Sequence, residues 1–413
     1  MRKKQAALIF IFATVLIDII GIGLIIPVLP QLLMEVSGLN TSESSFIGGT
    51  LIATYAIMQF FFAPVLGGLS DQFGRRPLLL MALFGLGLDY LIIVFAPNLI
   101  WLYIARMISG ICGSSITVAN AYIADISTPE NKAKNFGMIG AAFGLGFVIG
   151  PTLGGFLGEI GTRIPFMIAA GLAFLNMFYG LVAIPESLPH EDRRAFTWRR
   201  ANPFGTLKQI FSYKKIVGLM ISLFFIYVAA HATHTNWAYF TDEKFGWTPL
   251  DIGLSLGFVG IMVSIVQGGL VGPIVKKIGE VNAVYTGFVF NALGLLMMGL
   301  VPYGWMVYLV IIPYAFGGLA GPSLQSIMTS EVPKNAQGEL QGGITSVMTL
   351  TSIVGPLLMT GIFRYYTNQE NEIYFPGAPF IVGTFIAILS IFIARTSLVK
   401  LRQKTLAAQQ IIK

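Results

Sequence analysis

Long apolar runs separated by short polar segments recur along the whole chain. A helix that crosses a bilayer needs about 20 apolar residues, and each run has roughly that length. The pattern therefore predicts twelve membrane-spanning helices. The predicted spans cover residues 7–33, 46–69, 78–97, 99–124, 135–158, 164–184, 216–240, 251–275, 281–301, 304–330, 340–363 and 377–398.

The longest polar gap, 185–215, separates six spans from six. We therefore expect an all-α membrane protein with an N-terminal six-helix half over 1–184 and a cytoplasmic linker over 185–215. A C-terminal six-helix half would cover 216–398, and a cytoplasmic tail would cover 399–413.

An internal repeat supports this division. At a constant shift of 205 residues, several glycines of the first half meet glycines of the second, and so does one Gly-Pro pair. The pairs include Gly74 with Gly279 and Gly150-Pro151 with Gly355-Pro356. Duplicated halves around a central substrate site are a transporter architecture.

Composition excludes a water-soluble protein. Apolar residues make up 55% of the chain and charged residues 11%, whereas a soluble protein carries about 25% charged residues. The basic residues fall in separate loops rather than in one patch, so nucleic-acid binding is not indicated. The single cysteine, Cys112, excludes a disulfide framework. We interpret the basic N-terminus and its long apolar stretch as a retained first helix, because no small-residue cleavage site follows.

The distribution of lysine and arginine predicts the topology. Most of the 26 basic residues fall on one side of the membrane if the N-terminus is placed inside. Both termini are then cytoplasmic in a multi-pass protein of the cell membrane.

One polar segment, Gly67–Pro77, combines small residues, Asp71 and two arginines between two spans: GGLSDQFGRRP. We call it the gating loop and predict a short hinge there, because glycine permits tight turns and arginine pairs strongly with carboxylates. The alternative is a solvated turn with anchoring charges. The candidate residues of this loop are Gly67, Asp71, Gly74, Arg75 and Arg76.

The fifth span carries a glycine pattern, GMIGAAFGLGFVIGPTLGG, that begins at Gly137. It predicts a smooth helix face for close packing, with a proline bend. The alternative is an ordinary small-residue packing face. The motif residues are Gly146, Gly150, Pro151, Gly154 and Gly155.

Three ionisable residues fall inside spans: Asp18, Asp89 and Arg106. A charge at mid-bilayer costs at least a few kcal/mol, so each calls for a reason. We interpret them as a proton-coupling group in which the carboxylates load and release protons and Arg106 tunes them. The alternative for Asp89 is a structural Asp–Arg pair.

Uncharged polar residues inside spans are candidates for the wall of a substrate cavity, and each is alternatively a helix–helix hydrogen bond. They are Gln59, His231, Asn236, Gln267, Asn291 and Gln325. His231 and His234 share a helix face, but no third ligand accompanies them, so we expect no metal and no cofactor. The segment GLSLG fits a hydrolase motif, but it lies in a helical apolar run, and we expect no enzymatic activity.

The gating loop, the fifth-span motif, GIGLIIPVLP in the first span and ARMISG in the fourth resemble motifs of the major facilitator superfamily. The resemblance covers nearly the whole chain. Within the superfamily, the chain is similar to the tetracycline efflux proteins of the 12-helix drug/proton antiporter branch. It implies the superfamily fold and the exchange of a drug–divalent cation complex for a proton across a bacterial inner or plasma membrane. It also assigns proton coupling to Asp18 and Asp89. Where those exporters carry a histidine and an aspartate, this chain has Val263 and Asn291.

We therefore predict a proton-coupled efflux transporter that exports an amphiphilic small molecule by alternating access, acting as a monomer among membrane lipids. One alternative is a metabolite or lipid carrier of the same fold without proton coupling, which Val263 and Asn291 favour. A second is a membrane receptor or scaffold that does not transport.

Overall fold

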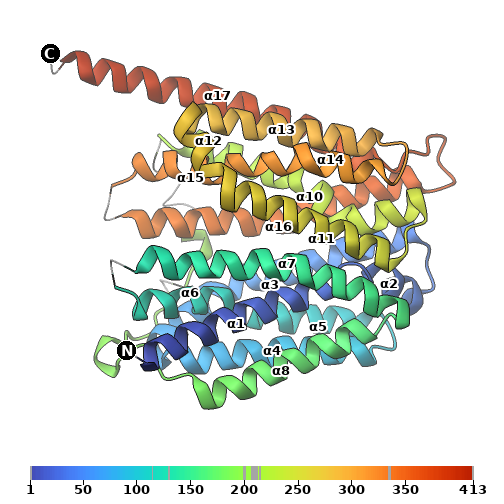
Figure 1. The fold of residues 1–413 in the computed structure, drawn as a ribbon, viewed down its shortest axis with the longest axis horizontal. Coiled ribbons are helices and arrows are strands. Elements are labelled where there is room, and N and C mark those ends of the chain that lie inside the picture. The colour runs from blue at the N-terminus through green and yellow to red at the C-terminus, as the bar shows by residue number, and fades with distance from the viewer. Residues whose placement is uncertain are drawn as a thin grey trace. The chain divides into compact units, whose positions relative to one another are not determined.

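The computed structural model describes residues 2–113, 115–128, 131–198, 201–205, 213, 215–333 and 336–411, and every regular element in these ranges is helical (Figure 1). The helices of the first part of the chain are α1 (Arg2–Ile25), α2 (Leu29–Ser37), α3 (Thr41–Phe73), α4 (Arg75–Phe95), α5 (Leu99–Cys112), α6 (Ser115–Ile126), α7 (Lys132–Ile160), α8 (Ile164–Ala183) and the 3₁₀ turn η1 (His190–Asp192). The later ones are α10 (Val217–Phe245), α11 (Pro249–Ile265), the π turn η2 (Val266–Leu270), α12 (Val271–Ile278), α13 (Glu280–Leu300), α14 (Met306–Ala315), the 3₁₀ turn η3 (Phe316–Leu319), α15 (Ala320–Ser330), α16 (Gln337–Thr367) and α17 (Ala378–Ile411).

Among the described residues, 11 helices are long and apolar enough to cross a membrane. They match the predicted spans except at two places. In the first span, 7–33, α1 ends at Ile25 and a separate helix, α2, begins at Leu29. In the fourth, 99–124, the structure has two shorter helices, α5 and α6, on either side of Gly113. Many of their side chains are apolar and exposed; Val182, for example, is 90% exposed. Such side chains suit contact with lipid. The helices also suit it, because they satisfy their backbone hydrogen-bonding groups internally.

The chain divides into two compact units, and neither is contiguous in sequence. The first comprises residues 1–203 and 241–261, and the second comprises 204–240 and 262–413. The boundaries predicted for the two halves, the linker and the tail remain a prediction. Residues 199–200, 206–212 and 214 of the predicted linker lie outside the described residues, as do Lys334 and Lys413, which the predicted topology also uses.

In the first unit, α1 packs against α7 and α8, and α4 packs against α5 and α8 (Figure 1). A buried apolar cluster joins α1, α4 and α6 near the end of the bundle that carries the gating loop. Phe10, Leu79 and Tyr122 are completely buried in it. This core holds in place the helix ends from which the loop residues project.

In the second unit, α13 lies against α14, α15 and α17. The predicted spans 251–275 and 304–330 both run through irregular turns here, the π turn η2 and the 3₁₀ turn η3. Isolated π turns within helices are frequent at functional sites. η2 and η3 contact each other, so the two distortions lie together.

The short hinge predicted in the gating loop is confined to a single residue. α3 continues to Phe73 and α4 begins at Arg75, so Gly74 alone separates the two helices. Gly74 has φ +104°, a backbone conformation that favours glycine. The remaining polar residues of the segment lie on helix ends, where their side chains have fixed directions.

Candidate functional site

Asp89 and Arg106 form an ion pair between α4 and α5. The Asp89 side chain is fully buried, and an Arg106 Nη2 donates to its Oδ2. A lone buried carboxylate would be costly, so the guanidinium is the group that makes the charge tolerable. Among the described residues, this is the most deeply buried ion pair.

Asp18, the third predicted proton-coupling residue, is 2% exposed on α1. Tyr90 links its surroundings to the ion pair. It is buried beside Asp89 on α4, and a Cβ on Gly21 of α1 would lie 3.1 Å from the Tyr90 hydroxyl. Tyr55 and Tyr90 are both within electrostatic reach of Asp18, Asp89 and Arg106. Sequence reasoning missed these tyrosines, because a tyrosine inside an apolar run carries no distinguishing pattern.

Gln59 lies close to the same region on α3. Its Nε2 donates to the Tyr55 hydroxyl at 3.1 Å and to the carbonyl oxygen of Gly113 at 2.9 Å. Gly113 is the C-cap of α5, so no N–H group of a continuing helix donates to its carbonyl oxygen in the usual way. Gln59 thus supplies a hydrogen-bond donor where the fourth span is interrupted.

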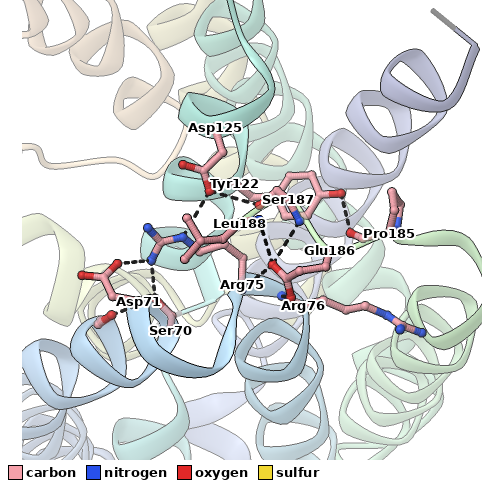
Figure 2. Close-up of polar contacts among 11 residues, drawn as sticks. Ser70, Asp71, Arg75, Arg76, Tyr122, Asp125, Pro185, Glu186, Ser187 and Leu188 are labelled. Carbon is pink, nitrogen blue, oxygen red and sulfur yellow. Dashed lines mark hydrogen bonds and ion pairs between the residues drawn. The ribbon is translucent and has the colours of Figure 1, made fainter. Parts of the chain in front are cut away.

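The gating loop brings together three acidic or hydroxyl partners around Arg75 (Figure 2). Arg75 Nη1 is 2.6 Å from Asp71 and donates to the Ser70 hydroxyl at 2.6 Å. Its Nε donates to Asp125 of α6 at 3.2 Å. The sequence singled out Asp71 and Arg75 but missed this partnership with Asp125. The arrangement ties the end of α3 to the end of α6 through one guanidinium.

The remaining loop candidates have different surroundings. Arg76 points to α8, where its Nη2 donates to the Leu181 carbonyl oxygen at 2.6 Å. A Cβ on Gly67 would meet nothing within 4 Å, so no close approach explains that glycine. A cavity of about 200 Å³ lies beside it, lined by Gly67, Asp71 and residues of the segment Arg194–Thr197.

The fifth-span motif uses two faces of α7. Gly146, Gly150 and Gly154 face α1, and a Cβ on Gly150 would lie 2.9 Å from the Gly23 Cα. Gly155 instead faces α11, where its Cβ would lie 3.2 Å from the Gly253 Cα.

The matching surface of α11 is formed by Gly253 and Gly260. Gly253 begins the GLSLG segment that fits a hydrolase motif, and Gly260 lies one turn beyond it. A Cβ on Gly253 would meet the Pro151 carbonyl oxygen, and one on Gly260 would lie 2.9 Å from Val148. Sequence reasoning missed this partner, although the recurring glycines of α11 were its visible sign.

Polar candidates of the second unit gather at the helix distortions. Gln267 lies in the π turn η2, and a Cβ on Gly318 of η3 would lie 3.0 Å from its Nε2. A Cβ on Gly317 would lie 3.3 Å from Asn291 Nδ2 on α13. The two amides therefore lie next to successive glycines of η3.

The other polar candidates have partners within the second unit. Gln325 donates to Gln341 at 2.8 Å, and the buried Asn236 donates to the Ala232 carbonyl oxygen at 3.4 Å. The His231 ring lies against Gly355, whose Cβ would come 2.5 Å from its Cγ, and stands perpendicular to the His234 ring at 5.9 Å.

Comparison with known proteins identifies relatives across this whole arrangement. Residues 11–356 match the Major Facilitator Superfamily. The chain is 39% identical over 387 residues to the class C tetracycline resistance protein of Escherichia coli, covering 94% of this chain and 96% of the relative. It is 38% identical to the class B protein of Escherichia coli, covering 85% and 86%. The fold matches a solved human organic anion transporter with a TM-score of 0.72 at 21% identity, covering 95% of this chain and 99% of that one. The chain therefore belongs to the major facilitator superfamily.

Proposed function

We propose that this protein exports a tetracycline-like amphiphilic compound, as a divalent-cation complex, in exchange for a proton. The buried Asp89–Arg106 pair carries the proposal. A charged carboxylate is costly inside a low-dielectric helix bundle, so Asp89 is suited to bind the proton that such exchange requires. The tetracycline resistance proteins that resemble the chain over almost its whole length support the substrate class.

In this proposal Asp89 takes up a proton when its site opens outward and releases it when the site opens inward. Protonation removes the carboxylate charge and frees Arg106 from the pair. Asp18, buried on α1 and linked through Tyr90, is the second proton-coupling residue. Access to the binding sites from one side of the membrane at a time is the general scheme of such carriers.

The gating loop holds one of the access states. Arg75 of α4 links Asp71 at the end of α3 to Asp125 at the end of α6, so separation of these helix ends breaks at least one of the two ion pairs. We place this loop and both termini in the cytoplasm, on the basis of lysine and arginine distribution, in the membrane of a bacterial cell. Each proposed group lies within one chain, and we propose a monomer.

The proposed substrate contacts are Gln267 and Asn291 beside η3. Val263 precedes them on α11, where a histidine would be expected from the resemblance. A neutral pair of amides suits hydrogen bonding to a polar edge of the substrate, and proton exchange then falls to the first unit.

Inside-out vesicles with an acid interior test the proposal. We expect tetracycline with Mg²⁺ to release protons from vesicles that carry the protein, and Asp89→Asn and Asp18→Asn to abolish the release. Asp251→Asn, which alters an exposed carboxylate at the start of α11, is the matched control. Silence with tetracycline and with unrelated amphiphiles, in protein shown to be folded, would contradict drug–proton exchange.

A further inference from the structure

Glu186, just after α8, caps the helix that carries the gating arginines (Figure 2). Its carboxylate accepts hydrogen bonds from the backbone N–H groups of Arg75 at 2.8 Å and of Arg76 at 3.2 Å. These are the first two residues of α4, whose amides have no partner within the helix. The N-cap residue is Gly74, which has no side chain to accept them. A carboxylate from 111 residues away therefore does the work of an N-cap.

The capping is reciprocal. Glu186 follows α8 and caps the start of α4, while Arg76 near the start of α4 donates to the Leu181 carbonyl oxygen in the last turn of α8. Negative charge is favourable at a helix N-terminus and positive charge at a C-terminus, so both contacts have the favourable sign. The two helix ends thus hold each other through side chains of opposite charge.

Local contacts keep Glu186 in this position. Its Oε1 also accepts from the N–H groups of Ser187 and Leu188, each at 3.0 Å. The Tyr122 hydroxyl donates to the Pro185 carbonyl oxygen at 2.8 Å. The carboxylate also occupies the space over Gly74, where a Cβ would lie 2.6 Å from the Glu186 Cδ.

The chain after Glu186 then follows the other side of the gating loop. The Arg194 N–H donates to the Asp71 carbonyl oxygen at 3.0 Å, and the Phe196 N–H donates to the Gln72 side chain at 3.2 Å. A Cβ on Gly68 would lie 2.9 Å from the Phe196 ring. The segment from Glu186 to Phe196 thus contacts both the end of α3 and the start of α4.

We propose that Glu186 is a positioning residue for the gating loop. Its carboxylate fixes the first turn of α4, and this turn holds the Arg75 guanidinium within reach of Asp71 and Asp125. Arg75 is the first residue of α4, so fraying of that turn moves the guanidinium directly. The effect on transport rests on the proposed function, whereas the effect on the helix end does not.

Hydrogen exchange tests the cap without any substrate. We expect the Arg75 and Arg76 amides of Glu186→Ala to exchange about fivefold faster than those of the unmodified protein, as loss of an N-cap predicts. Glu186→Gln keeps one acceptor oxygen and should give a smaller increase. Glu191→Ala, an exposed carboxylate five residues further along, is the matched control and should leave these amides unchanged. Unchanged exchange in Glu186→Ala would overturn the proposal, whether or not the protein transports tetracycline.

A double-mutant cycle tests the positioning role. We measure the maximal rate of tetracycline-driven proton release per folded protein for Glu186→Ala, Arg75→Ala and the pair. If Glu186 acts through Arg75, it lowers the rate alone but has no further effect in the Arg75→Ala background. Additive losses, or an unchanged rate per folded molecule, would overturn it. Absence of transport by the unmodified protein would contradict the proposed function, and hydrogen exchange would then decide the cap alone.

Discussion

Gly74 and Gly279 have the same backbone conformation at the same point of two separate helices. Their φ angles are +104° and +81°, and each is the N-cap of the helix that follows, α4 or α13. They are the pair that the 205-residue repeat matches in sequence. The repeat is therefore visible in backbone geometry, although the charges around the two glycines differ.

This relationship provides a matched pair of substitutions. Gly279→Ala meets open space and suffers only from the backbone conformation, a positive φ with ψ 158° that is almost exclusive to glycine and costs about 1–3 kcal/mol for other residues. Gly74→Ala suffers the same backbone cost and also displaces the Glu186 carboxylate. We expect Gly74→Ala to reduce proton–drug exchange far more than Gly279→Ala in vesicles. Equal losses would show that the space over Gly74 has no special importance.

The Asp89–Arg106 pair predicts a particular stability pattern. Arg106→Ala leaves a fully buried carboxylate without its cation and should lower the free energy of unfolding by about 3 kcal/mol. Adding Asp89→Asn removes that charge and should recover much of the loss. Thermal unfolding in detergent measures both variants. A double variant no more stable than Arg106→Ala would contradict this account of the pair.

The glycines of α7 are not equivalent. Gly150→Ala places a methyl group against the backbone of α1, where Gly23 and Ile20 cannot move aside without shifting the helix. Gly137→Ala, at the start of the same sequence pattern, meets nothing within 4 Å and is the control. We expect the first variant to lose transport and the second to retain it, as vesicle assays with equal protein amounts will measure.

His231 is expected to act through packing rather than by carrying a proton. Its ring lies against Gly355, so His231→Ala leaves an unfilled space and should lower the unfolding temperature. The pH profile of transport should keep its shape. His190→Ala, exposed in η1, serves as the control. A shifted pH profile in His231→Ala alone would instead assign this histidine to the proton path.

The membrane spans could be predicted from sequence because length and hydropathy alone decide whether a helix crosses a bilayer. The break at Gly113 could not, since glycine and serine, which occur there as Gly113, Ser114 and Ser115, also occur at the packing faces of unbroken membrane helices. Likewise the π turn at Gln267 leaves the hydropathy pattern unchanged. Local backbone irregularities inside lipid depend on neighbouring helices, and a linear pattern does not record those neighbours.

The candidate site was predictable where the cost of burial singles out a residue. Asp18, Asp89 and Arg106 stood out because charges in apolar runs are expensive, and the pairing of the last two followed from the need for a partner. The partners of the gating loop did not stand out. Asp125 and Glu186 lie 50 and 111 residues from Arg75, in polar segments where a carboxylate is ordinary. Their contacts come from the packing of α4 against α6 and α8.

The interrupted fourth span has a consequence for how the chain is assembled during synthesis. α5 has 14 residues, so it extends only about 21 Å and falls short of a hydrocarbon layer of about 30 Å. The Gly113 carbonyl oxygen at its end accepts a hydrogen bond from Gln59 of α3. Because α3 precedes α5 in the sequence, it has already been synthesised when α5 emerges. In lipid an exposed carbonyl is costly, so the fourth span leaves the translocon most favourably alongside the second rather than alone. We therefore expect the second and fourth spans to enter the bilayer together, with the hydrogen bond from Gln59 stabilising the pair.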